Sequence, residues 1–323
     1  MEHRQETKLE KLLRGRAEGA ALALRGCDPA QYEALRARFG EGCPQPLRLF
    51  EPCRAEHPHS GFLRKAAAHC GVPATQTTLF APGGKLHELR VEDGAAAEYF
   101  VKKPQDFEVL RGFLRDVELL PCKAQPAPEG AAQLALLGLT PVRELETRWA
   151  GPDTARQALE AADESAASCL RKLERHLRRR AEEACRAGCR ACVLRDGVAL
   201  PLSEDWLAQA ARHMEWLGRA GLFPWFEVSA PSAGLLAELF VAQAGAMLPL
   251  AAALGEGFPA LPAGARLLLE AEPSAGLPDA EGLKRLLYEC RGAVLLLDCR
   301  QADGERLSAV LEGLLPLVVQ AGG

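Results

Sequence analysis

The sequence lacks an apolar run of the length that a membrane span requires, and it lacks an excess of positive charge. A transmembrane helix needs about 20 consecutive apolar residues, and no hydrophobic run approaches that length. The opening segment MEHRQETKLEKLLRGR is polar and has no signal-peptide pattern. The net charge of −4 gives no basis for binding nucleic acid or an anionic membrane. We therefore expect a cytoplasmic protein that binds neither nucleic acid nor membrane.

A disulfide framework is not expected either, although the chain has 11 cysteines. The number is odd and no secretory signal is present, so the cysteines are interpreted as free thiols, with one or two available as metal ligands. Cys185, Cys189 and Cys192 have the C-x3-C-x2-C spacing of some iron–sulfur sites. The surrounding pattern instead predicts a helix end, a turn at Gly188 and the start of a strand. Such a path directs the three sulfurs differently, so we interpret these cysteines as structural.

What the sequence does contain, from residue 133 onward, is a repeated alternation of short apolar runs and amphipathic helices. Apolar runs flanked by helices are typical of a parallel sheet covered on both faces. At least six such units in series predict an α/β protein folded as a (β/α)8 TIM barrel. The predicted strands are 133–139, 191–196, 223–229, 245–250, 265–272 and 293–299, and the predicted helices include 152–186, 203–219, 233–243, 279–290 and 303–318.

The first third of the chain predicts an N-terminal extension made of helices and a β-hairpin. Segments 9–24 and 28–40 are predicted helices. Strands at 77–81 and 85–91 are joined by Pro82-Gly83-Gly84, a turn signal, and a helix is expected at 105–117. We therefore place the N-terminal element at residues 1–125 and the main body of the barrel at residues 126–323, within one structural domain.

A barrel of this kind carries its chemistry where its strands end, at the C-terminal rim. Buried acids cost free energy unless they are paired. A group of acids at one rim therefore indicates acid–base chemistry, binding of an amine, or a cation site. For two of them, Asp196 and Asp298, capping of the following helix is an equal alternative. The residues at the predicted rim are Asp196, Glu227, Glu270, Glu272, Asp298 and Cys299.

Glu227 is the favoured catalytic candidate because it lies in the aromatic segment PWFEVS. Desolvation in such surroundings would raise the pKa of its carboxyl group. Asp196 and Asp298 are the other catalytic candidates. The candidates for substrate binding are Trp225, Glu270 and Glu272.

Part of the sequence resembles a known family. The strand TTLF, the Pro-Gly-Gly turn, the strand KLHELR and the segment EYFVKKPQDFEVL at 98–110 resemble the uroporphyrinogen decarboxylase superfamily, in its methyltransferase-like branch. CRAGCRACVLRD at 185–196 and the segment 202–229 are similar to later barrel segments of that family. The resemblance implies a TIM barrel.

The resemblance also implies two chemistries. One is decarboxylation of uroporphyrinogen, but the Arg-rich loop that binds its propionates is absent from this sequence. The other is methyl transfer between a small substrate, a corrinoid carried by a partner protein, and a thiol or folate acceptor. In many such methyltransferases a His-x-Cys pair and a distant Cys hold zinc. Here Glu227 and Ser229 stand at the pair and Cys299 at the distant position, so Glu227 and Cys299 are the candidate zinc ligands.

The favoured hypothesis is a corrinoid (cobalamin)-dependent methyltransferase-like enzyme with a small-molecule substrate and a corrinoid protein docked at the barrel opening. One alternative is a catalytically degenerate binding or accessory protein of the same fold, because the His-x-Cys pair is lost. A further alternative is a decarboxylase of a small acid or a porphyrinogen. Members of the family often pair, so a homodimer is also expected.

Overall fold

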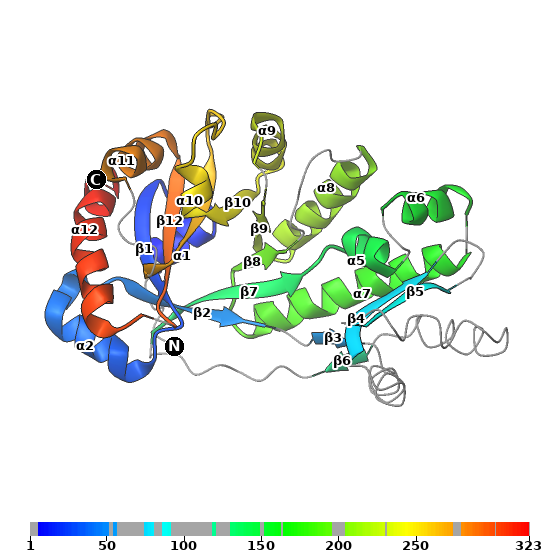
Figure 1. Ribbon diagram of the computed structural model, residues 1–323, viewed down its shortest axis with the longest axis horizontal. Helices are drawn as coiled ribbons and strands as arrows, with labels where there is room; N and C mark the ends of the chain where they lie inside the picture. The colour runs from blue at the N-terminus through cyan, green and yellow to red at the C-terminus, as the bar shows by residue number, and fades with distance from the viewer. Residues whose placement is uncertain are drawn as a thin grey trace. The chain divides into compact units, whose positions relative to one another are not determined.

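Eight parallel strands close into a barrel in the computed structural model of the chain (Figure 1). Their order around the wall is β1-β12-β11-β10-β9-β8-β7-β2. The closed parallel barrel with intervening helices confirms the predicted (β/α)8 fold. The structure describes residues 6–51, 54–56, 74–80, 86–91, 118–120, 130–148, 152–162, 164–195, 204–229, 231–273, 279–300 and 302–322.

All six strands predicted in the later part of the chain are present, each within a few residues of its expected bounds. Their central residues are buried, as expected for strands covered on both faces. The strands are β7 (Ala132–Gly138), β8 (Ala191–Leu194), β9 (Phe223–Glu227), β10 (Gly245–Pro249), β11 (Arg266–Ala271) and β12 (Gly292–Asp298).

The remaining two barrel strands come from the region predicted as an extension, which corrects the expected boundary at residue 125. They are β1 (Gly19–Arg25) and β2 (Gln45–Phe50). The predicted helix 9–24 is wrong in its second half: helix α1 (Lys8–Leu13) ends early, and Gly15 and Gly19 follow at φ 64° and 87°. Alanine and leucine favour helix locally, but seven parallel pairs with β12 fix residues 19–25 as a strand.

The barrel belongs to one of two compact units. That unit comprises Met1–Pro52, Lys123–Gly138 and Ala181–Gly323, and the other comprises Cys53–Cys122 and Leu139–Arg180. In the second unit, β4 (Ala74–Phe80) and β5 (Leu86–Val91) pair antiparallel, which confirms the predicted hairpin. A second antiparallel pair joins β3 (Arg54–Glu56) to β6 (Glu118–Leu120). The predicted turn at 82–84 and helix at 105–117 lie outside the described residues.

The helices predicted from residue 152 onward are present, and one of them is interrupted. The expected helix 152–186 is divided into α6 and α7, because Ala162 adopts a φ of 53°. Helix α2 begins as its sequence predicts, with Pro29 at the first position and the Asp28 carboxylate accepting from the Gln31 amide at 2.8 Å. The helices are α2 (Pro29–Phe39), α5 (Pro141–Arg148), α6 (Pro152–Glu160), α7 (Glu164–Arg186), α8 (Glu204–Arg219), α9 (Ala233–Val241), α10 (Leu250–Ala253), α11 (Ala280–Glu289) and α12 (Gly304–Gly322), with a 3-10 turn at Gly40–Gly42.

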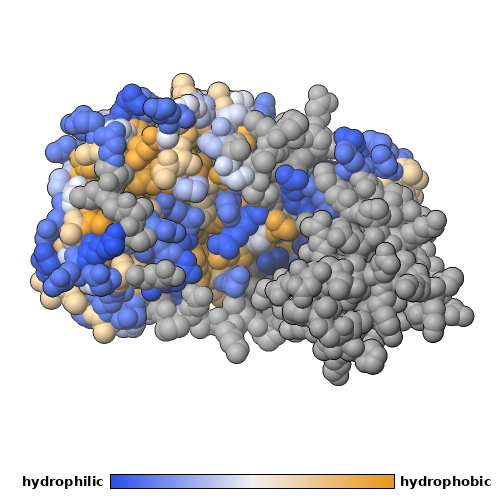
Figure 2. Space-filling view, viewed as in Figure 1, coloured by the Kyte–Doolittle hydropathy of each residue, from blue (hydrophilic) through white to orange (hydrophobic). Residues whose placement is uncertain are grey.

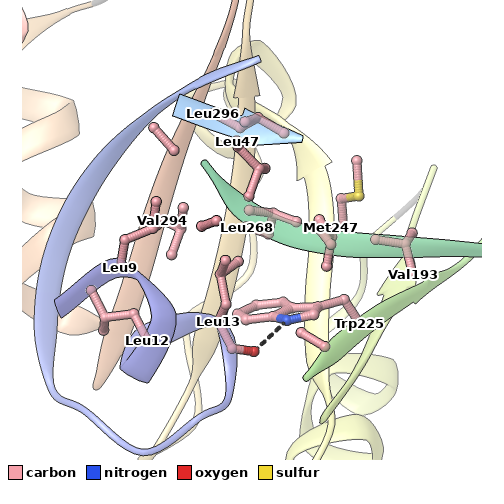
Figure 3. Packing of buried hydrophobic residues seen from close by; sticks show 14 of the residues in the cluster. Leu9, Leu12, Leu13, Leu47, Val193, Trp225, Met247, Leu268, Val294 and Leu296 are labelled. Carbon is pink, nitrogen blue, oxygen red and sulfur yellow. Dashed lines mark hydrogen bonds between the residues drawn. The ribbon is translucent and has the colours of Figure 1, made fainter. Parts of the chain in front are cut away.

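The barrel interior is apolar and is closed at its N-terminal end by α1 (Figure 3). Leu9, Leu12 and Leu13 of α1 pack against the inward side chains of the strands. Trp225 of β9 lies in this cluster with 1% of its surface exposed, and its indole N–H donates to the Leu13 carbonyl oxygen at 2.9 Å. The opposite, C-terminal end is therefore the end at which inward-facing side chains meet solvent.

Hydrophilic residues cover much of the face shown in Figure 2, and hydrophobic residues are visible between them. Among the helices described, none combines the length and the apolar character needed to cross a bilayer.

Candidate functional site

The alternation of side chains along the barrel strands leads from an apolar interior to charged residues at the C-terminal end. Successive inward positions carry Ala23 on β1, Leu268 on β11 and Leu296 on β12. Because the period of a strand is two, the next inward positions on these strands are Arg25, Glu270 and Asp298. The same step leads from Val193 to Arg195 and from Trp225 to Glu227. Five charged side chains thus end five strands of one barrel.

Arg25 holds the centre of this group. Its Nη2 donates to Asp298 Oδ2 at 2.6 Å, and its Nη1 is hydrogen-bonded to Glu270 Oε1. The Arg25 side chain is 11% exposed, against 14% for Asp298 and 27% for Glu270. Its Nε is buried and has no hydrogen-bond partner among the described residues. A largely buried guanidinium therefore keeps one donor unsatisfied beside two carboxylates.

Asp298 is held in its ionised form. Burial alone would raise its pKa, but hydrogen bonds from Arg300 and Arg25 outweigh burial and hold the pKa far below the usual range. Arg300 Nε donates to both carboxylate oxygens, at 2.9 and 3.1 Å. A carboxylate that is bound on both sides by arginines positions cations and is poorly suited to carry a proton near neutral pH. Asp298 is therefore held between the side chains of Arg25 and Arg300.

Glu227 does not lie in the aromatic enclosure that its sequence context indicated. Its side chain is 40% exposed, and Arg195 Nε lies 3.5 Å from Glu227 Oε2. The neighbouring rings, Trp225 and Phe226, are buried with 1% and 0% exposure. Exposure and a cation at its side oppose the desolvation on which the sequence argument depended. Glu227 is nevertheless the last residue of β9, at the C-terminal end of the barrel.

The other predicted residues have separate positions. Glu272 is exposed just beyond β11. Asp298 raises the pKa of Arg300, and the negative charges of Glu270 and Glu272 add to this effect. Trp225 was predicted to bind substrate, but the structure assigns it to the core at the closed N-terminal end, where packing against α1 covers it. Asp196 lies outside the described residues.

Arg25 is a site residue that the sequence does not indicate, because residues 9–24 are predicted as a helix. The positions Ala21, Ala23 and Arg25, spaced by two, are the signal from which this end of a strand could have been found.

Two thiols lie directly behind the Arg25–Asp298 pair. Cys27 and Cys299 are 4% and 2% exposed and hydrogen-bonded to each other. This contact lowers the pKa of Cys27 against the opposing effects of burial and Asp28, and it raises the pKa of Cys299 together with burial. The Cys299 amide donates to the Arg25 carbonyl oxygen at 2.8 Å, which ties the two strand ends together.

The described residues do not fit the predicted zinc site. β10 and β11 separate β9, which carries Glu227, from β12, which precedes Cys299. Within the part of the chain that the structure describes, no group of three or more His, Cys, Asp or Glu residues has the arrangement of a metal site. The Cys299 thiol donates to the Leu297 carbonyl oxygen at 3.5 Å and is in hydrogen-bond contact with the Cys27 thiol, and Glu227 faces an arginine.

Cys185, Cys189 and Cys192 have the positions that the sequence predicted, in the last turn of α7, after the turn at Gly188 and in β8. The Cys185 thiol donates to the Ala220 carbonyl oxygen at 3.3 Å and the Cys189 thiol to Gln133 Oε1 at 3.7 Å. Cys192 is buried with 0% exposure. The three sulfurs have different surroundings.

Comparison with known proteins gives similarity of fold only. No family model matches the chain, and no curated protein matches it. A methyltransferase from Methanosarcina mazei is similar with a TM-score of 0.44 at 11% identity, covering 95% of this chain and 97% of that one. Dispersin B is similar with a TM-score of 0.38 at 9% identity, covering 95% and 99%. A xylose isomerase domain containing protein from Salmonella typhimurium LT2 has a TM-score of 0.34 at 14% identity, covering 58% and 88%. These values are too low for any conclusion about activity.

Proposed function

We propose that the protein is a TIM-barrel enzyme that binds a small charged substrate at the C-terminal opening of its barrel. The observation that carries this proposal is the Arg25 group, in which a guanidinium 11% exposed contacts two carboxylates on adjacent strands. Burying these charges costs more than packing apolar side chains there would. Charged networks retained against that cost are typical of functional sites.

Each charged residue has a distinct role in this proposal. Arg25 binds an anionic group of the substrate, because Glu270, its more exposed carboxylate partner, is displaceable and leaves Nη1 free to donate to that group. Asp298 fixes the orientation of Arg25. Glu227, at the exposed side of the opening, is the candidate acid–base group or the partner of a positively charged substrate atom. Arg195, beside Glu227, partly compensates the negative charge of this carboxylate.

For the reaction itself, we propose methyl transfer of the corrinoid-dependent type, with a corrinoid protein docked at the barrel opening. The support is the sequence resemblance, whose hairpin is present as β4 and β5. In this proposal Arg25 and Glu227 orient the substrate.

Two other functions each have one observation in their favour. A near-buried arginine at the mouth also suits a decarboxylase of a small acid, since guanidinium binds carboxylate in a fixed geometry. An accessory binding protein is favoured by the pairing of the described acids with arginines, which leaves Asp298 unsuited to proton transfer. The experiment below separates all three.

The full-length protein is incubated with free methylcobalamin and a thiol acceptor such as homocysteine, and loss of the methylcobalamin absorbance is followed. Demethylation above the protein-free rate supports methyl transfer. The variant Arg25→Ala should lose this rate, while Arg291→Ala should keep it. Arg291 is a matched control because it also contacts a glutamate, Glu18 at 2.9 Å, but is 55% exposed and precedes β12 at the other end of the barrel.

The same two variants are examined by thermal shift with a series of small mono- and dicarboxylates. A shift that depends on Arg25, without demethylation, favours the decarboxylase or the binding protein, and carbon dioxide release separates these two. If no carboxylate and no corrinoid changes the wild-type protein, the proposal of a charged-substrate site at this opening is wrong.

A further inference from the structure

Cys27 and Cys299 form a pair of buried thiols that the proposed function does not use. They follow β1 and β12, which are paired in parallel from Gly19↔Gly292 to Arg25↔Asp298. The register brings Arg25 and Asp298, 273 positions apart in the chain, to the same rim. The side chains of Cys27 and Cys299 are 4% and 2% exposed and hydrogen-bonded to each other. The Cys299 amide donates to the Arg25 carbonyl oxygen at 2.8 Å, so the two segments are also adjacent at the backbone.

The other described cysteines do not share this arrangement. Burial raises the pKa of Cys189, Cys192 and Cys290, in the case of Cys290 to about 12. Of the seven cysteines whose side chains the structure describes, Cys27 and Cys299 are the two whose thiols are hydrogen-bonded to each other. The pair thus offers one sulfur to react with an oxidant and a second sulfur to resolve the product.

Gly26 and Arg300 define the surroundings of Cys27. Gly26, between Arg25 and Cys27, has a φ of 71°, and a methyl group added there would lie 2.3 Å from Arg300 Cγ. The aliphatic stem of Arg300 therefore lies over the strand end beside Cys27. Arg300 is 62% exposed and is held by Asp298. Movement of the Arg300 side chain would open this strand end to a small oxidant.

We propose that Cys27 and Cys299 are a redox-active dithiol that a peroxide converts into a disulfide joining the ends of β1 and β12. The Cys27 thiolate attacks one peroxide oxygen and breaks the O–O bond, giving a sulfenic acid on Cys27 and hydroxide. The Cys299 sulfur then attacks the Cys27 sulfur, the S–S bond forms, and the displaced hydroxyl leaves as water with the Cys299 proton. Two thiols are oxidised by two electrons, and one hydrogen peroxide is reduced to two waters. A thiol reductant converts the disulfide back into the two thiols.

The disulfide would affect the candidate site although none of the charged residues of that site takes part in the bond. Cys27 is two residues after Arg25, and Cys299 directly follows Asp298. A covalent link between these segments would fix the distance between the two strand ends that carry the ion pair. The inference is independent of which substrate the barrel opening binds.

The test uses the full-length protein, reduced with dithiothreitol, freed of reductant and exposed to hydrogen peroxide. Remaining thiols are blocked with N-ethylmaleimide in denaturant, and the digest is examined by mass spectrometry without reduction. We expect a peptide pair joined through Cys27 and Cys299 as the main cross-link, lost after dithiothreitol. Protein unfolded in urea before oxidation should give scattered pairings instead.

Cys27→Ser and Cys299→Ser should each lose the cross-link, and Cys290→Ser should keep it. Cys290 is a matched control because it is also buried, at 7% exposure, and follows a helix at the other end of β12. Circular dichroism checks that each variant is folded. The proposal is overturned if folded wild-type protein shows no Cys27–Cys299 peptide while other cysteines are oxidised, or if both thiols remain open to alkylation after complete consumption of peroxide.

Discussion

Arg25 and Asp298 are register partners across the β1–β12 pair, and the guanidinium of the first donates to the carboxylate of the second at 2.6 Å. They come from opposite ends of the sequence and meet where both strands end. Glu270, on the strand beyond β12, is the second partner of Arg25. The ion-pair group thus joins the ends of three adjacent strands, and the residues that close the barrel are also those that face its opening.

Replacing Asp298 with asparagine should destabilise the protein clearly. The change leaves Arg25, 11% exposed, with Glu270 as its remaining ion-pair partner among the described residues. Removing one member of a largely buried pair leaves an under-compensated charge, so we expect a loss of about 2 kcal/mol in the free energy of unfolding, measured with urea. Glu312→Gln is the control, because the Arg38–Glu312 pair is also 2.6 Å long but more than half exposed on both sides. That variant should lose at most about 0.5 kcal/mol. Equal losses in the two variants would contradict a special role for burial.

The contribution of Asp298 should also depend on pH in one direction. Its pKa in the folded protein is depressed by Arg300 and Arg25 in spite of burial, whereas the unfolded value is about 3.9. A depressed folded pKa gives stability that is fully present above the unfolded pKa and is lost as the pH falls toward the folded pKa. The stability difference between wild type and Asp298→Asn should therefore stay constant from pH 7 to about 5 and shrink below about pH 4. A difference that grows on acidification would show that the assignment is wrong.

The strands of this fold can be predicted from the sequence where both of their faces are buried. β10, β11 and β12 are short runs of Leu, Val, Ala and Met covered on both faces, and such runs have few alternatives between two helices. β1 was not predictable in this way. Its residues 20–24 are alanine and leucine, which favour helix, and only the distant β12 makes them a strand. The helical preference of these residues is outweighed by their pairing with β12, which the sequence does not indicate.

The candidate site was predictable in its acids and not in its cations. Glu227, Glu270 and Asp298 lie near the C-terminal ends of predicted strands, so the rule for strand ends locates them. Arg25 is the last residue of a strand whose sequence predicts a helix. Without that arginine, the acids suggested metal binding, and with it they form ion pairs. Similarly, Trp225 was assigned to the opening because sequence shows that it lies in a strand near Glu227 but not that α1 covers it.

Replacing Trp225 with phenylalanine should reduce stability and leave the barrel opening unchanged. The variant loses the indole N–H that donates to the Leu13 carbonyl oxygen at 2.9 Å and leaves a space beside α1. We expect a loss of about 2 kcal/mol in the free energy of unfolding, measured with urea and followed by circular dichroism. Trp216→Phe on α8, where the side chain is half-buried, should lose less than half of this. If Trp225→Phe instead abolishes ligand shifts while stability is unchanged, the placement of Trp225 in the core is wrong.

Gly26→Ala should be more damaging than Gly40→Ala, although both glycines have positive φ. Gly26 has a φ of 71° and Gly40 one of 57°, so both substitutions place an L side chain on a backbone conformation that such residues rarely adopt. At Gly40 an added methyl group meets nothing within 4 Å, whereas at Gly26 it lies 2.3 Å from Arg300 Cγ. Arg300 must then leave Asp298, and we expect a further loss of about 1 kcal/mol. Urea unfolding of the two variants measures the difference. Equal losses would mean that Arg300 moves without effect on Asp298.

Glu227→Gln should separate catalysis from stability. The Arg195–Glu227 pair is 3.5 Å long with side chains 46% and 40% exposed, and pairs of this kind contribute at most about 0.5 kcal/mol. The variant should therefore unfold at nearly the wild-type urea concentration. If Glu227 is the acid–base group of the proposed reaction, the rate of methylcobalamin demethylation should fall about 100-fold, because the amide keeps the shape and loses the proton.

The matched control for this variant is Glu215→Gln. Glu215 also contacts an arginine, Arg219, on the exposed surface of α8, with side chains 63% and 75% exposed. It should change neither rate nor stability. A full rate in Glu227→Gln would transfer the proton role to another group, whereas equal falls in rate and stability would show that Glu227 acts on the fold. Because Asp298→Asn is expected to give the opposite combination, a large loss of stability, the two carboxylates at one rim are distinguished by the same pair of measurements.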